Sequence, residues 1–210
     1  MLEELDNFVI DPTIKAENEL VRGRAYAGLE DVPEAIDAYT GVTTSYPRSK
    51  FSAEAFFRMG VIYQEKLDSL EVAQQKFDNV PRQYASSEFA EDAVARSVSI
   101  SKLLRLQASI EAGEGENNAA VQFDLAEIEL FQFKNYTKAL AGYRRVLDEF
   151  PESDLAPKAA YAIAFIYDTH LDDPTRAREA YQAVVDRYPE SQQAEFARSA
   201  LGDMPGRDDQ

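Results

Sequence analysis

The side chains that most often perform catalysis or bind metals are scarce in this sequence. His170 is the only histidine, cysteine is absent, and acidic residues number 38. A lone histidine beside a predicted turn is usually solvated, and paired acids are expected by chance in so acidic a chain. The sequence has no glycine-rich phosphate loop, no HExxH motif and no GxSxG motif. We therefore predict no catalytic residue, no metal site and no cofactor, and a protein that is not an enzyme.

The excess of acidic residues also limits the partners of the chain. With 22 basic residues, the net charge is −16, which would repel nucleic-acid phosphates and anionic membrane surfaces. No apolar run approaches the roughly 20 residues of a membrane span. The first residues, MLEELDNFVIDPT, show no basic segment followed by an apolar one, as a signal peptide would. We predict no nucleic-acid partner, no direct membrane span and no signal peptide in this sequence.

One spacing of small, aromatic and apolar residues recurs four times along the chain. The small residues let two helices approach closely, and aromatic residues three or four positions apart form the apolar stripe of a helix. The pattern therefore predicts repeated pairs of packed helices. Its positions are Gly23, Tyr26, Ala35, Tyr39, Val42 and Pro47; Gly60, Tyr63, Ala73, Phe77, Val80 and Ala85; Leu130, Ala139, Tyr143, Val146 and Pro151; and Ala164, Tyr167, Ala177, Tyr181, Val184 and Pro189.

Each segment also carries signals for the ends of its helices. A serine, aspartate or asparagine lies four residues before the alanine of each second helix. Such residues are favoured at the N-cap, because their side-chain oxygen can accept a hydrogen bond from an unpaired backbone N–H. The sequences YPRS, FPES and YPES place a proline where that second helix must end, followed by a serine that can begin the next. These motifs therefore separate helical hairpins. The predicted N-caps are Asp31, Ser69, Asn135 and Asp173.

The whole pattern resembles the tetratricopeptide repeat, a helix–turn–helix unit of about 34 residues. The resemblance covers roughly residues 16–201. It implies an all-α fold, a TPR-like α-solenoid in which antiparallel helix pairs stack into a right-handed superhelix. With four visible repeats and the flanking segments, we expect about nine to eleven helices.

The repeat pattern is interrupted between residues 86 and 118. Residues 87–101 align with residues 49–63 at an offset of 38, which predicts a third first-helix without a recognisable partner. Residues 86–112 contain neither glycine nor proline. Their sequence predicts either one long helix or a helix with a shortened partner. The segment EAGEGENN is polar, acidic and glycine-bearing, as linkers are.

We therefore expect two stacks of repeats. The predicted ranges are an N-terminal extension at 1–15, a first stack at 16–112 with two clear repeats and a degenerate third, an acidic linker at 113–118, a second stack at 119–201 with a terminal capping helix, and a disordered tail at 202–210. A single continuous solenoid with one degenerate repeat is the alternative.

The resemblance implies that the first helix of each repeat lines a concave surface that binds partners. Aromatic residues on this surface could hold apolar side chains of a peptide, and the alternative is that they pack against neighbouring helices. The predicted partner-binding residues are Leu20, Arg24, Phe57, Val61, Asp124, Ile128, Phe131, Tyr161 and Phe165, with Glu17, Ala27, Glu54, Gln64, Val121, Lys158 and Asp168 on the same face.

Arg24, Arg58 and Arg96 fall on neighbouring positions of three successive first helices. Their placement resembles the carboxylate clamp by which some members hold the C-terminal tails of heat-shock chaperones. However, Leu20 and Asp92 stand where that clamp has lysine. Our hypothesis is that the three arginines form a positive strip that binds an acidic peptide bidentately. The alternative is that they pair with nearby glutamates such as Glu54.

These features predict a scaffold that binds proteins or peptides on its concave face. The YPxS motifs and the period of 38 residues resemble bacterial envelope TPR proteins, namely the repeat subunit of the outer-membrane β-barrel assembly machinery and the repeat protein of the Tol–Pal system. This resemblance implies a location at the periplasmic face of the outer membrane. The alternatives are a cytoplasmic adaptor or regulatory protein and a structural component that associates with copies of itself.

Overall fold

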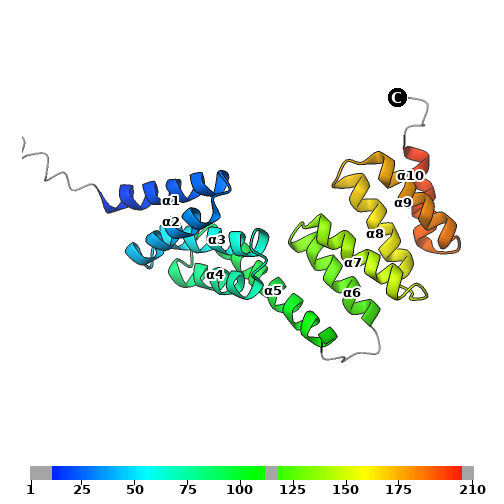
Figure 1. Ribbon diagram of the computed structural model, residues 1–210, viewed down its shortest axis with the longest axis horizontal. Coiled ribbons are helices and arrows are strands. Elements are labelled where there is room, and N and C mark those ends of the chain that lie inside the picture. Colours follow the sequence, from blue (N-terminus) through cyan, green and yellow to red (C-terminus); the bar gives the residue numbers. More distant parts are fainter. Residues whose placement is uncertain (1–10, 112–117, 205–210) are drawn as a thin grey trace, which may run out of the picture. The chain divides into compact units, whose positions relative to one another are not determined.

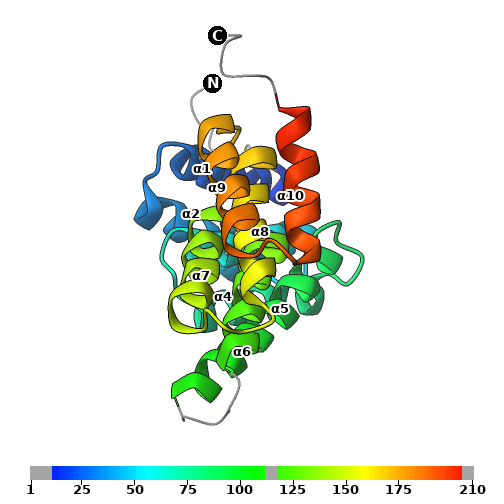
Figure 2. The same ribbon diagram turned by 90° about the vertical axis from the view of Figure 1, so that its right-hand side faces the viewer.

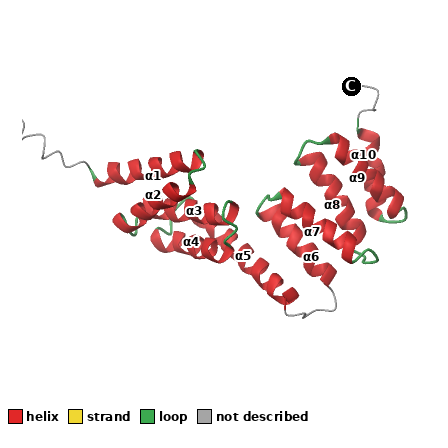
Figure 3. Ribbon diagram, viewed as in Figure 1, coloured by secondary structure: helices red, strands yellow, loops and turns green. Residues whose placement is uncertain are grey.

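The computed structural model describes residues 11–111 and 118–204. These residues form ten α-helices and one π-helical segment, with no strand among them (Figures 1 and 3). The all-α prediction is therefore confirmed for this part of the chain. In order, the elements are α1 (Pro12–Gly28), α2 (Val32–Ser45), α3 (Lys50–Glu65), α4 (Leu70–Gln83), α5 (Ala90–Glu111), α6 (Asn118–Glu127), η2 (Ile128–Gln132), α7 (Tyr136–Glu149), α8 (Ala156–Thr169), α9 (Pro174–Arg187) and α10 (Gln192–Asp203).

The helices form two compact units, Met1–Leu104 and Arg105–Gln210, whose boundary falls within α5. Residues 113–117 of the predicted linker lie outside the described residues, and Asn118 already begins α6. α1 begins at Pro12, inside the range predicted for the extension, with Asp11 as its N-cap. Residues 205–210 of the predicted tail also lie outside the described residues. The domain boundaries and the right-handed superhelix stay predictions.

Within each unit, consecutive helices pair through short turns. In the first unit α1 packs on α2, α3 packs on α4, and α2 packs on α3. In the second unit α6 packs on α7 and α8 packs on α9, while α10 contacts both α8 and α9 (Figure 2). Each unit is thus a stack of helical hairpins, which is the arrangement that the repeats predict.

The second helices of the repeats supply the cores of both units. In every second helix the predicted alanine, aromatic residue and valine are at most 1% exposed. These residues are Ala35, Tyr39 and Val42; Ala73, Phe77 and Val80; Ala139, Tyr143 and Val146; and Ala177, Tyr181 and Val184. Burying a large apolar side chain stabilises a fold by roughly 1.5–3 kcal/mol. The repeated columns are therefore the main source of apolar packing between hairpins.

Two glycines show why the first helix needs a small residue. A Cβ atom added to Gly23 would lie 2.5 Å from Cε1 of Tyr39, and one added to Gly60 would lie 2.6 Å from Cε1 of Phe77. Real Cβ atoms do not approach a ring so closely. In the first two repeats the glycine of the first helix therefore makes room for the aromatic ring of the second helix.

The turns inside the four hairpins share a backbone feature that the sequence pattern does not reveal. Glu30, Asp68, Lys134 and Asp172 have φ values of 60°, 50°, 54° and 49°, which lie in the left-handed region. Each of them directly precedes a predicted N-cap residue. A non-glycine residue in this region is uncommon, so its recurrence at one position marks a common turn geometry.

The four predicted N-cap residues all directly precede their helices, but only two use their side chains. The side chain of Asn135 accepts a hydrogen bond from the Lys138 N–H, and that of Asp173 accepts one from the Arg176 N–H. Asp31 and Ser69 make no such bond. The position of the second helices was therefore predictable, whereas the capping bonds were confirmed only in the second unit.

Residues 90–111 form one helix of 22 residues, which decides between the two predictions for this region. The backbone N–H of Ala93 bonds to Phe89 at its start. α5 therefore has the place of a third first-helix, and it is 22 residues long where α3 has 16.

Candidate functional site

A cavity of about 360 Å³ opens in the first unit between α1, α3 and the connection from α4 to α5. Leu20 and Arg24 of α1 line it, as does Glu54 of α3, and all three were predicted to lie on the concave face. The remaining lining residues are Glu17, Lys50, Phe51, Tyr84, Ser86, Ser87, Glu88 and Phe89. Apolar and charged groups therefore meet in one cavity of a size suited to a few side chains.

The α4–α5 connection contributes Tyr84 to the cavity, and it lacks the proline of the other repeats. Tyr46, Phe150 and Tyr188 precede prolines, and their ψ angles are 54°, 52° and 52°. Tyr84 precedes Ala85, and its ψ angle is 98°. Its side chain is 44% exposed, whereas the three equivalent rings are half-buried. The missing proline thus coincides with a ring that lines the cavity.

Aromatic rings form the wall beside the cavity. Phe89 stacks on Phe57 with 4.9 Å between ring centroids, and Phe57 packs at 5.7 Å against Phe77 in the core. The guanidinium carbon of Arg58 lies 5.9 Å from the centre of the Phe89 ring. Phe57, a predicted partner-binding residue, therefore packs chiefly within the unit and supports Phe89, which lines the cavity.

The predicted positive strip is neutralised by acidic residues. Nε of Arg58 donates to the Glu54 carboxylate at 2.6 Å, and Nε of Arg24 lies 3.3 Å from the same carboxylate oxygen. Glu54 is only 15% exposed at its side chain. Two of the three arginines therefore meet a carboxylate of the protein before any ligand binds, as the alternative interpretation predicted.

Arg96 is occupied even more completely. Its Nη1 donates to Oε1 of Gln64 at 3.0 Å and lies 3.3 Å from Glu65, and its Nε lies 3.2 Å from Asp92. The guanidinium carbon also lies 5.9 Å from the centre of the Phe57 ring. These contacts fasten α5 to α3. The hypothesis of three available arginines therefore loses its support, because each already pairs with an acid.

The other predicted residues of the first unit differ in accessibility. Leu20 is 1% exposed and belongs to the core, so it can form only the floor of the cavity. Val61 is half-buried on α3. Periodicity placed both residues on the inner face, but it could not tell a buried leucine from an accessible one.

In the second unit the predicted residues also divide between core and surface. Ile128 is buried in η2, whereas Phe131 is 58% exposed. Tyr161 is half-buried and packs against Tyr181 and Phe196, with 5.6 Å and 6.0 Å between ring centroids. Phe131 and Tyr161 remain candidates for contact with a partner, whereas Ile128 serves packing.

The last two predicted residues of the second unit, Asp124 and Phe165, are half-buried. Phe165 lies 5.6 Å from the ring of His170, which stacks on Tyr136 at 4.7 Å. His170 is therefore an aromatic packing partner at the end of α8. Across residues 11–111 and 118–204, no group of three histidine, cysteine, aspartate or glutamate residues could hold a metal ion.

Sequence reasoning missed seven of the eleven residues that line the cavity. Lys50 and Phe51 lie in the first turn of α3 and the other five lie in the α4–α5 connection, so the predicted inner-face positions do not include them. One feature of the sequence could have indicated the α4–α5 connection, namely Ala85 at the position of the repeated proline.

None of the helices described by the structure combines the length and apolarity needed to cross a bilayer.

Comparison with known proteins finds one matching family and a similar solved structure. The family model of the tetratricopeptide repeat matches residues 120–153 and 158–191. No curated protein matches the sequence. One solved structure, described as "Crystal structure of YrrB: a TPR protein with an unusual peptide-binding site", is 16% identical, covers 86% of this chain and 90% of its own, and has a TM-score of 0.39. The similarity to the tetratricopeptide repeat family is thus found over residues 120–153 and 158–191 of the second unit.

Proposed function

We propose that this protein is a non-enzymatic scaffold that binds an extended peptide segment of a partner protein in the cavity of the first unit. The observation that carries this proposal is the cavity itself, since it gathers Phe51, Tyr84 and Phe89 beside the inner faces of α1 and α3. A single apolar side chain buried there would contribute roughly 1.5–3 kcal/mol to binding.

The charges around the cavity indicate which residues should flank the apolar side chain of such a peptide. Within the described residues, Lys50, Glu17 and Glu88 form no ion pair, whereas Arg24 is paired with Glu54. Nζ of Lys50 lies 5.1 Å from the centre of the Phe51 ring. The peptide we propose therefore carries an apolar or aromatic side chain for the rings, flanked by charged residues that meet Lys50 or the two glutamates.

An array of random dodecapeptides, probed with the full chain, tests this proposal. The Tyr84→Ala variant should weaken binding to the selected peptides by about tenfold, because the most exposed ring of the cavity is lost. Leu29→Ala is the matched control, since Leu29 is an exposed apolar residue at the α1–α2 turn, away from the cavity. Equal binding by the wild type and the Tyr84→Ala variant would exclude this cavity as the peptide site.

We also propose that Phe131, Tyr161 and Phe165 provide a second contact for the same class of partner. Phe131 is the most exposed of the predicted aromatic residues, so Phe131→Ala can be tested on the same array without disturbing the core. A variant that binds every selected peptide as tightly as the wild type would limit the binding surface to the first unit.

The biological setting that we propose is bacterial envelope assembly, with a cytoplasmic adaptor as the alternative. The support is the resemblance of the YPxS motifs to envelope repeat proteins. Fractionation of cells that express the tagged gene product separates the two, since recovery with the outer membrane supports the first and recovery with the cytoplasm supports the second.

A further inference from the structure

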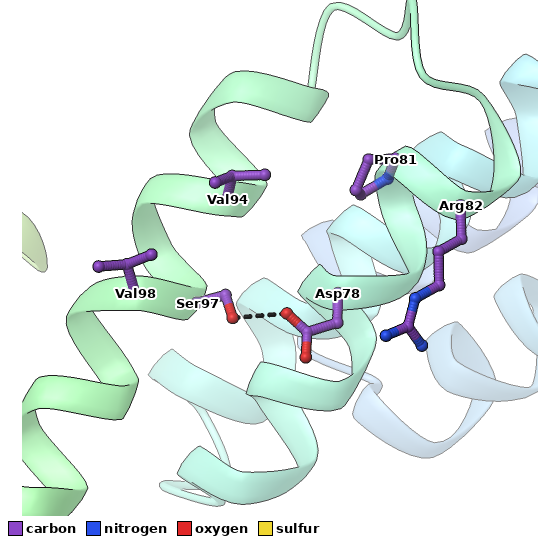
Figure 4. Close-up of a pocket in the computed structure, with 6 residues that line it drawn as sticks. All are labelled: Asp78, Pro81, Arg82, Val94, Ser97 and Val98. Carbon is purple, nitrogen blue, oxygen red and sulfur yellow. Dashed lines mark hydrogen bonds between the residues drawn. The ribbon is translucent and has the colours of Figure 1, made fainter.

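The face of α5 that borders α4 forms an open groove of about 440 Å³ in the first unit. The residues lining it are Asp78, Pro81, Arg82, Val94, Ser97 and Val98 (Figure 4). Val94 and Val98, one turn apart on α5, are 51% and 63% exposed. The two valines are thus accessible in the part of the chain that the structure describes.

α5 is held firmly in this position. The hydroxyl of Ser97 donates to Oδ1 of Asp78 at 2.6 Å (Figure 4), and Arg96 on the other side of the helix bonds to Gln64 of α3. Because α5 is anchored to both helices of the preceding hairpin, its exposed valines belong to a fixed surface.

A second helix of the repeat type could not cover this face in the usual way. Val98 stands 38 positions after Gly60, at the place where the first helix makes room for an aromatic ring. At Gly60 even a Cβ atom would lie 2.6 Å from Phe77. A branched valine at this place therefore excludes the ring, and the face must accept a partner that meets valine with a small or aliphatic side chain.

The charges on this face are arranged to complement a second copy of the same helix. Glu91, Val94, Val98 and Lys102 follow at spacings of three, four and four, so they share one side of α5. The acid lies before the valines and the base after them. If two copies run antiparallel about the midpoint of the valines, Val94 of each copy meets Val98 of the other, and Glu91 meets Lys102.

We propose that this face is a homodimer interface in which two copies pack α5 antiparallel across a two-fold axis. The valine pairs occupy the centre of the contact, and a Glu91–Lys102 pair lies at each end. Pro81 and Arg82 of α4 border the groove that receives the partner helix. A self-complementary pattern favours a second copy over an unrelated helix, since a two-fold interface uses the same patch twice.

Sedimentation equilibrium of the full chain, from micromolar to hundreds of micromolar concentration, tests the proposal. We expect the wild type to reach twice the chain mass of 23.6 kDa, and we expect Val98→Lys to remain at the mass of one chain. Val21→Lys is the matched control, because Val21 is a 52% exposed valine on α1 of the same unit, and it should dimerise like the wild type. A wild type that stays monomeric throughout would overturn the proposal.

A charge exchange makes the test specific for the antiparallel geometry. Glu91→Lys and Lys102→Glu should each weaken the dimer by about tenfold, because each turns two attractive pairs repulsive. The double variant restores opposite charges at both ends and should recover the wild-type dissociation constant. Thermal unfolding of each variant confirms that it is folded. Failure of the double variant to recover dimerisation would overturn the antiparallel arrangement.

Discussion

Arg24 and Arg58 converge on a single carboxylate oxygen of Glu54, at 3.3 Å and 2.6 Å. This contact joins α1 to α3 next to the candidate cavity, and it neutralises part of the charge of the two arginines. Ligand binding at this place therefore competes with a carboxylate that the protein supplies itself. The strength of that competition can be changed by a single substitution.

Glu54→Gln should increase the affinity of the first unit for acidic peptides. The substitution removes the internal negative charge, so Arg24 and Arg58 can bond to an external carboxylate. We expect an increase of about three- to tenfold at low salt, which falls as added salt screens the interaction. Fluorescence anisotropy with a glutamate-rich peptide measures it.

Glu19→Gln is the control for this substitution, because Glu19 forms an exposed pair with Arg22 at 2.8 Å within α1. It removes one negative charge from the same unit without releasing an arginine at the cavity. An equal gain in affinity for both variants would mean that the effect comes from net charge alone.

Gly60→Ala should destabilise the first unit by roughly 1–3 kcal/mol, as expected when a packed core is overfilled. The added Cβ would lie 2.6 Å from Phe77, whose ring is completely buried and cannot move aside. Urea unfolding, monitored by circular dichroism, measures the change in the free energy of unfolding.

Gly41→Ala should have the opposite effect. Gly41 lies on an exposed side of α2, where an added Cβ meets nothing within 4 Å. Alanine there should stabilise the helix by roughly 0.5–1 kcal/mol, because glycine loses more backbone entropy on folding. If both variants shifted stability in the same direction, ring contact would not be the reason for the glycine at position 60.

The close contact at Gly60 shows which parts of this structure can be predicted from the sequence. A small residue of the first helix must fit against the aromatic ring of the second helix, as Gly23 and Gly60 do, and this requirement recurs at a fixed spacing in the sequence. The pairs Glu54–Arg58 and Asp92–Arg96 are four residues apart on one helix, so spacing alone could have predicted them.

Contacts between residues of different helices cannot be predicted from such a spacing. Arg24 reaches Glu54 across 30 positions of sequence, and the relative rotation of α1 and α3 decides whether they meet. The accessibility of Leu20 likewise depends on how deeply α1 is set into the unit. The candidate cavity was only partly predictable for the same reason, since a connection outside the helical pattern forms one side of it.

The buried tyrosines should make the fold sensitive to alkaline pH. Burial raises the pKa of Tyr39, Tyr143, Tyr181 and Tyr188 above the ordinary value, because desolvation penalises the phenolate. A neighbouring negative charge, Glu127, adds to the effect at Tyr143. Since the folded state favours the neutral phenol, this contribution to stability is complete below about pH 10 and is lost as pH rises toward the folded-state values.

We expect the free energy of unfolding to fall by roughly 1–3 kcal/mol between about pH 9 and pH 11, as measured by urea unfolding at each pH. Tyr143→Phe should reduce this slope, because one buried phenol no longer titrates. Tyr46→Phe, at a half-buried ring, controls for the loss of a hydroxyl. A slope that Tyr143→Phe leaves unchanged would contradict the assignment to this tyrosine.

Ala85→Pro should close the candidate cavity by restoring the repeated motif. In the other repeats the aromatic residue before the proline has a ψ angle of 52–54° and a half-buried ring, as at Tyr46. Proline at position 85 would recreate the motif that accompanies these angles in the other three repeats, so Tyr84 should adopt their ψ angle and turn its ring inward. The affinity for cavity-binding peptides should then fall by about as much as in Tyr84→Ala.

The same variant should not lose stability, which separates it from a folding defect. Among the hydrogen bonds of the described residues, none uses the Ala85 N–H, so a proline there removes no bond. The reduced freedom of the unfolded chain should stabilise the protein by roughly 0.4–1 kcal/mol. Isothermal titration of a selected peptide, combined with urea unfolding, gives both quantities. Unchanged peptide affinity in a stabilised Ala85→Pro variant would show that the missing proline does not govern access to the cavity.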